Sequence, residues 1–180
     1  MYYWADYSMD MYPLFGFFSE ERLKEQANWV ENFPVGAAEW SGDSGATVAA
    51  FSLGSMPDDM KGTADAVVFI RALHNLARFE GQGGFLTAAL QNAFDVLKPG
   101  ATVGVVQHMA RNDMPDERAG GQNGYLKKDF VIEVMEKAGF EFVEDSDINF
   151  NPKDQPTDQD IVWRLPPSLA TSCAMPGSPT

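Results

Sequence analysis

The stretch that decides the fold is "DVLKPGATVGVVQHMA", residues 95–110. Its Lys-Pro-Gly triplet is a stop signal for a helix predicted over residues 86–97. The following run, "ATVGVVQ" at 101–107, has no polar alternation, which is typical of a strand buried on both faces of a parallel sheet. A helix that leads directly into such a strand indicates the α/β class. The helix is supported by apolar residues at helical spacing, namely Leu86, Leu90, Ala93, Phe94 and Leu97.

The rest of the chain alternates between the same two kinds of element. Further strands are predicted at 1–6, 46–52, 66–70, 140–148 and 160–166. A helix is expected to begin with Ser19 as its N-cap and to end at Pro34, and another covers 130–138 with Gly139 as its C-cap. Residues 71–84 are expected to form a polar loop and a glycine-rich turn. This order predicts a mostly parallel sheet with helices on both faces.

Composition limits the classes of partner. The 180 residues include 13 Lys plus Arg and 26 Asp plus Glu, so the net charge is -13, which repels nucleic acid and anionic lipid. No apolar run approaches the roughly 20 residues of a membrane span, and the first residues do not resemble a signal peptide, so a cytoplasmic location is expected. We expect one domain at 1–165 and a disordered tail at 166–180. The tail contains the only cysteine, Cys173, to which we assign no role.

Ligands of open α/β sheets bind beyond the carboxyl ends of the strands. Asp6, Ser52, 71–75 and 107–110 follow predicted strand ends, so they are the candidate site residues. The only two histidines, at positions 74 and 108, fall in these segments and are candidate general bases.

Two more side chains are candidates on the same grounds. Arg71 offers a planar guanidinium to a carboxylate of a ligand, or it pairs with an acid of the chain itself. Tyr125 follows Gly124 at a helix entrance and is a candidate to shape a substrate pocket. No spacing of His, Cys, Asp and Glu indicates a metal site.

Four segments, taken in order, resemble a known family. "DAVVFIRALHNL" at 65–76, "LKPG" at 97–100, "TVGVVQHMA" at 102–110 and "VIEVMEKAGFEFVEDSD" at 131–147 are similar to the second half of class I S-adenosylmethionine-dependent methyltransferases. The likeness covers residues 64–165 and is strongest to a bacterial group of predicted small-molecule methyltransferases. That group has an Arg-x-x-His-Asn stretch, matched here by Arg71, His74 and Asn75.

The resemblance implies a Rossmann-like sheet of strand order 3-2-1-4-5-7-6 whose seventh strand is antiparallel. Residues 1–6 would be its second strand, with Asp6 bonded to the ribose of S-adenosylmethionine. Ser52, Ile70, Arg71 and Asn75 would lie around the same cofactor. His74 and His108 would be the catalytic groups acting on an unidentified small molecule.

The same resemblance implies that the chain is truncated at its N-terminus. The family's glycine-rich loop follows strand one, whereas the first glycine here is Gly16, beyond the predicted second strand. Ser52 and Gln107 stand where family members often carry acidic residues.

Loss of a central strand would leave two edges facing each other. The second strand then slides across to pair with the fourth, or an upstream segment fills the place, or a partner chain, such as a second copy, supplies the strand. A competing placement makes 1–6 the first strand itself.

Three functional hypotheses remain open. The first is a methyltransferase acting on a small molecule, and the second is a non-catalytic remnant or interaction protein that keeps the sheet. The third is an unrelated α/β enzyme that uses His74 and His108 as acid and base.

Overall fold

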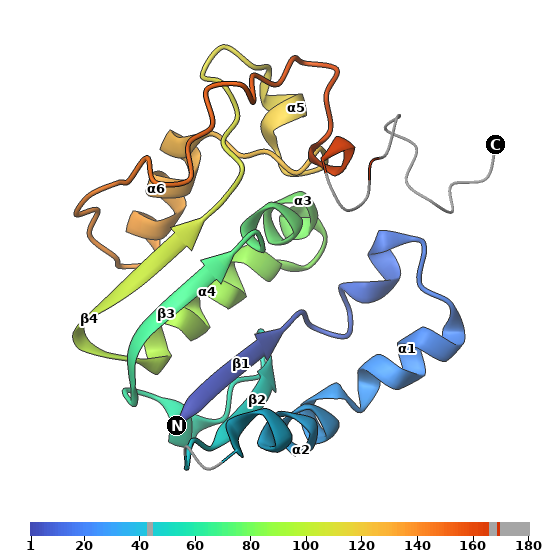
Figure 1. Ribbon diagram of the computed structural model, residues 1–180, viewed down its shortest axis with the longest axis vertical. Helices are drawn as coiled ribbons and strands as arrows, with labels where there is room; N and C mark the ends of the chain where they lie inside the picture. Colours follow the sequence, from blue (N-terminus) through green and yellow to red (C-terminus); the bar gives the residue numbers. More distant parts are fainter. Residues whose placement is uncertain (43–44, 166–168, 170–180) are drawn as a thin grey trace.

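The computed structural model describes residues 1–42, 45–165 and 169 (Figure 1). Four strands are assigned in this part of the chain, and both strand pairs are parallel. The mixed α/β class is therefore confirmed. The elements, in chain order, are β1 Tyr2–Asp6, α1 Glu20–Ala27, α2 Trp29–Ser41, β2 Val48–Ser52, β3 Ala64–Ile70, α3 Leu73–Gly83, α4 Phe85–Val96, β4 Leu97–Val106, α5 Asp116–Ala119 and α6 Lys128–Lys137, with 3₁₀ turns at Tyr12–Phe15, Asp58–Met60 and Val162–Arg164.

The strands form two small sheets rather than one continuous sheet. β1 pairs with β2, and β3 pairs with β4. β1 lies beside β3 and points in the same direction (Figure 1), but the two strands share no ladder. The predicted second strand has therefore not moved across to pair with β3.

The first helix begins where the sequence predicts and ends elsewhere. The Arg22 N–H donates to the Ser19 side chain at 3.3 Å, so Ser19 is the N-cap of α1. The helix then breaks at Asn28 and resumes as α2, which continues through Pro34. The prediction that Pro34 ends the helix is wrong, because packing of α2 on β2 and of Phe33 on Trp4, with ring centroids 5.2 Å apart, compensates for the lost hydrogen bond.

The prediction of a polar loop after the third strand is wrong. Residues 73–83 form α3, which places Leu73, Leu76 and Phe79 on one buried face. The predicted end of the following helix is also displaced, since α4 ends at Val96 and Leu97 already pairs with Ala64. Lys-Pro-Gly therefore lies in the irregular start of β4, before the regular ladder begins at the Thr102 and Ala66 pair.

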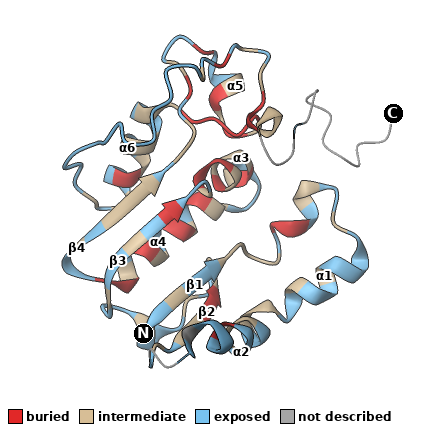
Figure 2. Cartoon of the chain, in the orientation of Figure 1, coloured by how far each residue is buried: buried red, intermediate tan, exposed pale blue. Residues whose placement is uncertain are grey.

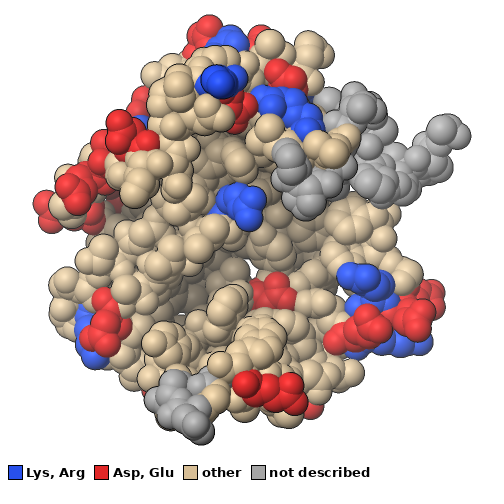
Figure 3. All heavy atoms as spheres, in the orientation of Figure 1, with Lys and Arg blue, Asp and Glu red and all other residues tan. Residues whose placement is uncertain are grey.

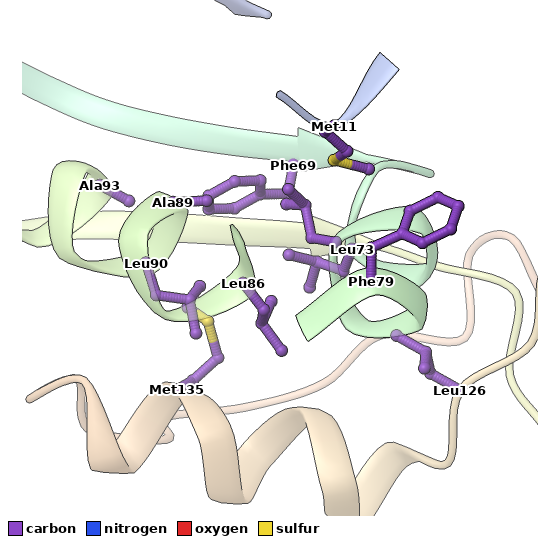
Figure 4. Close-up of a cluster of buried hydrophobic side chains, with 11 residues drawn as sticks. Met11, Phe69, Leu73, Phe79, Leu86, Ala89, Leu90, Ala93, Leu126 and Met135 are labelled. Carbon is purple, nitrogen blue, oxygen red and sulfur yellow. The ribbon is translucent and has the colours of Figure 1, made fainter. Parts of the chain in front are cut away.

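One cluster of eleven buried side chains forms the main core (Figure 4). It lies between one face of the β3–β4 sheet and helices α3, α4 and α6, and it takes Met11 from the N-terminal region. Phe69 faces this cluster, whereas Val68 and Ile70 on the opposite face are 60% and 61% exposed. The predictions of helices on both faces and of a strand buried on both faces are thus wrong for this sheet (Figure 2).

The two predicted C-terminal strands are absent from the described residues. Residues 141–147 are irregular, with Val143 84% exposed, because acidic side chains interrupt the apolar pattern. Val162–Arg164 is a 3₁₀ turn that bonds to Asn123 through the Val162 N–H, at 2.8 Å. An antiparallel last strand is accordingly missing here, and the predicted tail, with Cys173, lies almost wholly outside the described residues.

Within the described residues, no helix is both long enough and apolar enough to cross a membrane.

Candidate functional site

The carboxyl ends of β1, β3 and β4 lie toward one end of the molecule, which we name the carboxyl edge (Figure 1). Asp6 ends β1 and stands in register with Ser52, the last residue of β2. Ile70 ends β3 and is paired with Val106, the last residue of β4. The parallel ladders thus place the predicted residues in two groups at this edge, one on each sheet.

Asp6 is held by donors from three segments. Its Oδ1 accepts from the Tyr7 N–H at 2.8 Å, and its Oδ2 accepts from the Tyr12 hydroxyl at 2.6 Å and from the Gln26 amide. Burial, together with the bond to Asp6, raises the pKa of Tyr12, so this hydroxyl stays protonated. Asp6 therefore fastens the turn at Tyr12 and helix α1 to the end of β1.

Tyr7 links the two sheets at the carboxyl edge. Its hydroxyl accepts from Asn75 Nδ2 at 3.1 Å and donates to the Ala72 carbonyl at 3.4 Å. Burial raises the pKa of this phenol. Asn75, predicted to contact a cofactor, is thus used for joining β1 to α3. No sequence pattern predicted a role for Tyr7, Tyr12 or Gln26, although Tyr7 directly follows a predicted strand end.

His74 is a buried, neutral side chain on α3. Burial lowers its pKa to about 4, and the nearby positive groups of His108, Arg78 and Arg71 act in the same direction. Its Nδ1 lies 3.4 Å from Gln107 Oε1. Because Gln107 Nε2 donates to the Gly124 carbonyl at 2.9 Å, the amide oxygen is the acceptor and Nδ1 carries the hydrogen. A base of such low pKa is poorly suited to proton abstraction at neutral pH.

His108 is the more accessible histidine. It lies just past β4, only partly buried, with its ring 6.2 Å from that of Tyr125. Burial lowers its pKa, and the charge of Arg71 adds to this effect. Since Arg71 acts on both histidines, these three side chains belong to one group at the end of the β3–β4 sheet. His108 is therefore the better candidate for proton transfer.

Arg71 has an unusual backbone and a free charge. Its φ of 53° is in the left-handed region, which non-glycine residues rarely adopt. Its N–H donates to the Val106 carbonyl at 2.7 Å, so the end of the ladder holds this conformation. Throughout the described part of the chain, no carboxylate forms an ion pair with its guanidinium.

A glycine-rich loop at 120–124 packs against α3 beneath His74. A Cβ on Gly121, where φ is 98°, would lie 2.0 Å from the His74 carbonyl oxygen, and one on Gly124 would lie 2.0 Å from a Val162 methyl group. Only glycine fits at either place. The next residue, Tyr125, is 1% exposed, and its hydroxyl has no hydrogen-bond partner. The pattern Gly-Gly-x-Asn-Gly was the available signal for this contact.

Within the described residues, no three side chains among His, Cys, Asp and Glu gather closely enough to hold a metal ion. No family model, no curated protein and no solved structure matches this chain.

Proposed function

We propose that the chain is a methyltransferase-like α/β protein that binds S-adenosylmethionine at the carboxyl edge and passes its methyl group to a small molecule. The observation that supports this proposal is the placement of the strands. β2 and β1 lie on one side of a gap, β3 and β4 on the other, and all four are parallel (Figure 1). This agrees with the expected strand order with its central strand missing.

The side chains present fit the two polar ends of such a cofactor. A carboxylate has about four acceptor positions, and Asp6 uses three, so one remains for a ribose hydroxyl. The unpaired guanidinium of Arg71 suits the carboxylate of the methionine part. The cofactor, when bound, supplies a methyl group on a positively charged sulfur. His108 would take the proton that the acceptor loses as the methyl group is added.

Calorimetric titration with S-adenosylhomocysteine tests the proposal. We expect measurable heat from the unaltered chain and at least a tenfold weaker affinity for Arg71→Gln, because the carboxylate loses its ionic partner. Arg22→Gln, which makes the same charge change on the exposed surface of α1, is the matched control and should bind normally. Absence of heat and of a thermal shift at millimolar ligand contradicts the proposal.

A second candidate, a non-catalytic interaction protein, is favoured by a different observation. Asp6, Asn75 and His74 each form hydrogen bonds within the chain, so these candidate site residues already have structural partners. A chain that is folded and does not bind S-adenosylhomocysteine in the titration would support this candidate.

A further inference from the structure

The edge of β3 that faces β1, which we call its inner edge, has backbone N–H and C=O groups that form no ladder. In a parallel ladder, alternate residues of a strand bond to one neighbour while the residues between them point the other way. The Arg71 N–H donates to the Val106 carbonyl, which fixes the alternation. Val67 and Phe69 therefore bond to β4. Ala66, Val68 and Ile70 direct their N–H and C=O groups to the opposite side.

The inner edge of β1 is free in the same way. The Tyr2 N–H donates to the Thr47 carbonyl at 2.8 Å, and the Leu53 N–H donates to the Asp6 carbonyl at 2.8 Å. Even-numbered residues thus bond to β2. The backbone groups of Tyr3 and Ala5 point away from β2, and within the described part of the chain they form no backbone hydrogen bond outside the ladder.

Side-chain hydrogen bonds cross the gap between these two edges at both of its ends. At one end the hydroxyls of Thr63 and Tyr3 are hydrogen-bonded at 2.9 Å, and at the other end the Tyr7 hydroxyl is bonded to Asn75. In both contacts a tyrosine side chain reaches across the gap. The two strands therefore lie further apart than the roughly 4.8 Å that separates paired strands. The surface between the sheets is hollowed (Figure 3). We name this place, bordered by residues 2–6 and 66–70, the β1–β3 slot.

The borders of the slot lack the features that protect exposed strand edges. Free edges normally carry Lys, Pro or inward-pointing charges, because unpaired backbone invites another strand. Residues 2–6 and 66–70 contain no proline, and Asp6 is the one charged residue among them, with its carboxylate already bonded to Tyr7, Tyr12 and Gln26. Large apolar side chains on these strands are more than half exposed, namely Tyr2, Trp4, Val68 and Ile70. Such a surface is typical of an interface.

We propose that the β1–β3 slot binds an extended segment, about five residues long, of a different polypeptide chain that carries net positive charge. The segment would lie parallel to β1 and β3, bond to both edges and carry apolar side chains. The charge of -13 favours a basic partner. A second copy cannot supply one of its described strands, because each is already paired along one edge and an inserted strand needs both. The inference goes beyond the proposed function and requires no cofactor.

Hydrogen–deuterium exchange tests this inference with a synthetic peptide of alternating Val and Thr between paired lysines. In the free chain, the amides of Tyr3, Ala5, Val68 and Ile70 should exchange quickly, while those of Val67 and Phe69 are protected by β4. A saturating concentration of the peptide should slow hydrogen exchange at the amides of Tyr3, Ala5, Val68 and Ile70 at least tenfold. A peptide with prolines at the central positions is the control, since it lacks the donors.

Two substitutions separate the slot from general instability. Val68→Pro removes a donor that faces the slot and none that bonds to β4, so the chain should fold and lose peptide protection. Val67→Pro breaks the β3–β4 ladder and should unfold the chain. The inference is overturned if the peptide protects no amide, if the four amides are already protected in the free chain, or if their protection rises with protein concentration, which would identify a second copy as occupant. None of these outcomes depends on S-adenosylhomocysteine.

Discussion

The two sheets of this protein have the same parallel construction and very different support. The β3–β4 sheet packs one face on the eleven-residue cluster, with helices on the other side of that cluster (Figure 4). The region of β1, β2, α1 and α2 has few buried apolar residues, and α1 has none among them. From the N-terminal part of the chain, Met11 is buried in the main cluster, and Tyr7, Leu14, Phe15 and Leu53 pack against it while only partly buried. The comparison teaches that the region of β3, β4, α3, α4 and α6 folds around its own core, whereas the region of β1, β2, α1 and α2 is attached to it.

The largest expected effect is loss of a core side chain beneath β3. Leu73→Ala should lower the free energy of unfolding by about 2–5 kcal/mol, because Leu73 is 1% exposed within the cluster. Urea unfolding followed by circular dichroism measures this change. Leu23→Ala on α1 makes the same deletion at a half-buried position and should cost less than half as much. Equal losses would mean that both regions share one core.

Acid should lower the free energy of unfolding through protonation of His74, which lies on α3. Its folded pKa of about 4 lies below the unfolded value of 6.5, so the stabilisation is complete above pH 6.5 and is lost as the pH falls toward 4. Across this pH range the free energy of unfolding should fall by a total on the order of 3 kcal/mol because of this side chain. His74→Gln keeps an amide donor and cannot titrate, so the difference in unfolding free energy between pH 7 and pH 4.5 should shrink. An unchanged difference would show that His74 is accessible to protons in the folded chain.

A smaller effect is expected where the two regions join. Tyr7→Phe removes the hydroxyl that contacts Asn75 and Ala72, which should cost about 1 kcal/mol. Limited proteolysis should cut α1 and α2 faster, while amide exchange in α3 and α4 stays slow. Tyr3→Phe, at the exposed opposite end, is the comparison variant and should have a weaker effect. Uniformly faster exchange would contradict a separate attachment.

The smallest effect is expected in the segment after α6. Val143→Ser should change the free energy of unfolding by less than about 0.5 kcal/mol, because the side chain is 84% exposed. Thermal denaturation measures the difference. A loss above 2 kcal/mol would place this segment in a sheet after all.

Local signals in the sequence predicted several of the ordered elements, although the strands predicted at 140–148 and 160–166 are absent from the described residues. The strands at 1–6 and 66–70, the Ser19 cap and the helix before Gly139 depend on neighbouring residues, and all are confirmed. The errors occur where distant contacts decide. Pro34 sits inside α2 because β2 supports that helix, and α3 was missed because its polar residues outnumber the buried Leu73, Leu76 and Phe79.

The candidate site shows the same division. Strand ends predicted that Arg71 and His108 would lie together, because the parallel β3–β4 ladder places them by register, whereas Asp6 belongs to the separate β1–β2 ladder. The partners of these residues could not be predicted. Gln26 reaches Asp6 from twenty positions away, and Gln107 fixes the tautomer of His74 from thirty-three. Such pairings depend on tertiary packing, which no local pattern encodes.

The unprotected borders of the β1–β3 slot have a consequence for the behaviour of the protein in solution. Other proteins keep copies apart with a lysine or proline placed on the edge itself. This chain has only the long-range repulsion of its net charge of -13. That repulsion extends about 30 Å at 0.01 M salt and about 3 Å at 1 M. The colloidal stability of the protein should therefore be governed by ionic strength, with added salt favouring association of copies through the exposed side chains of Trp4, Val68 and Ile70.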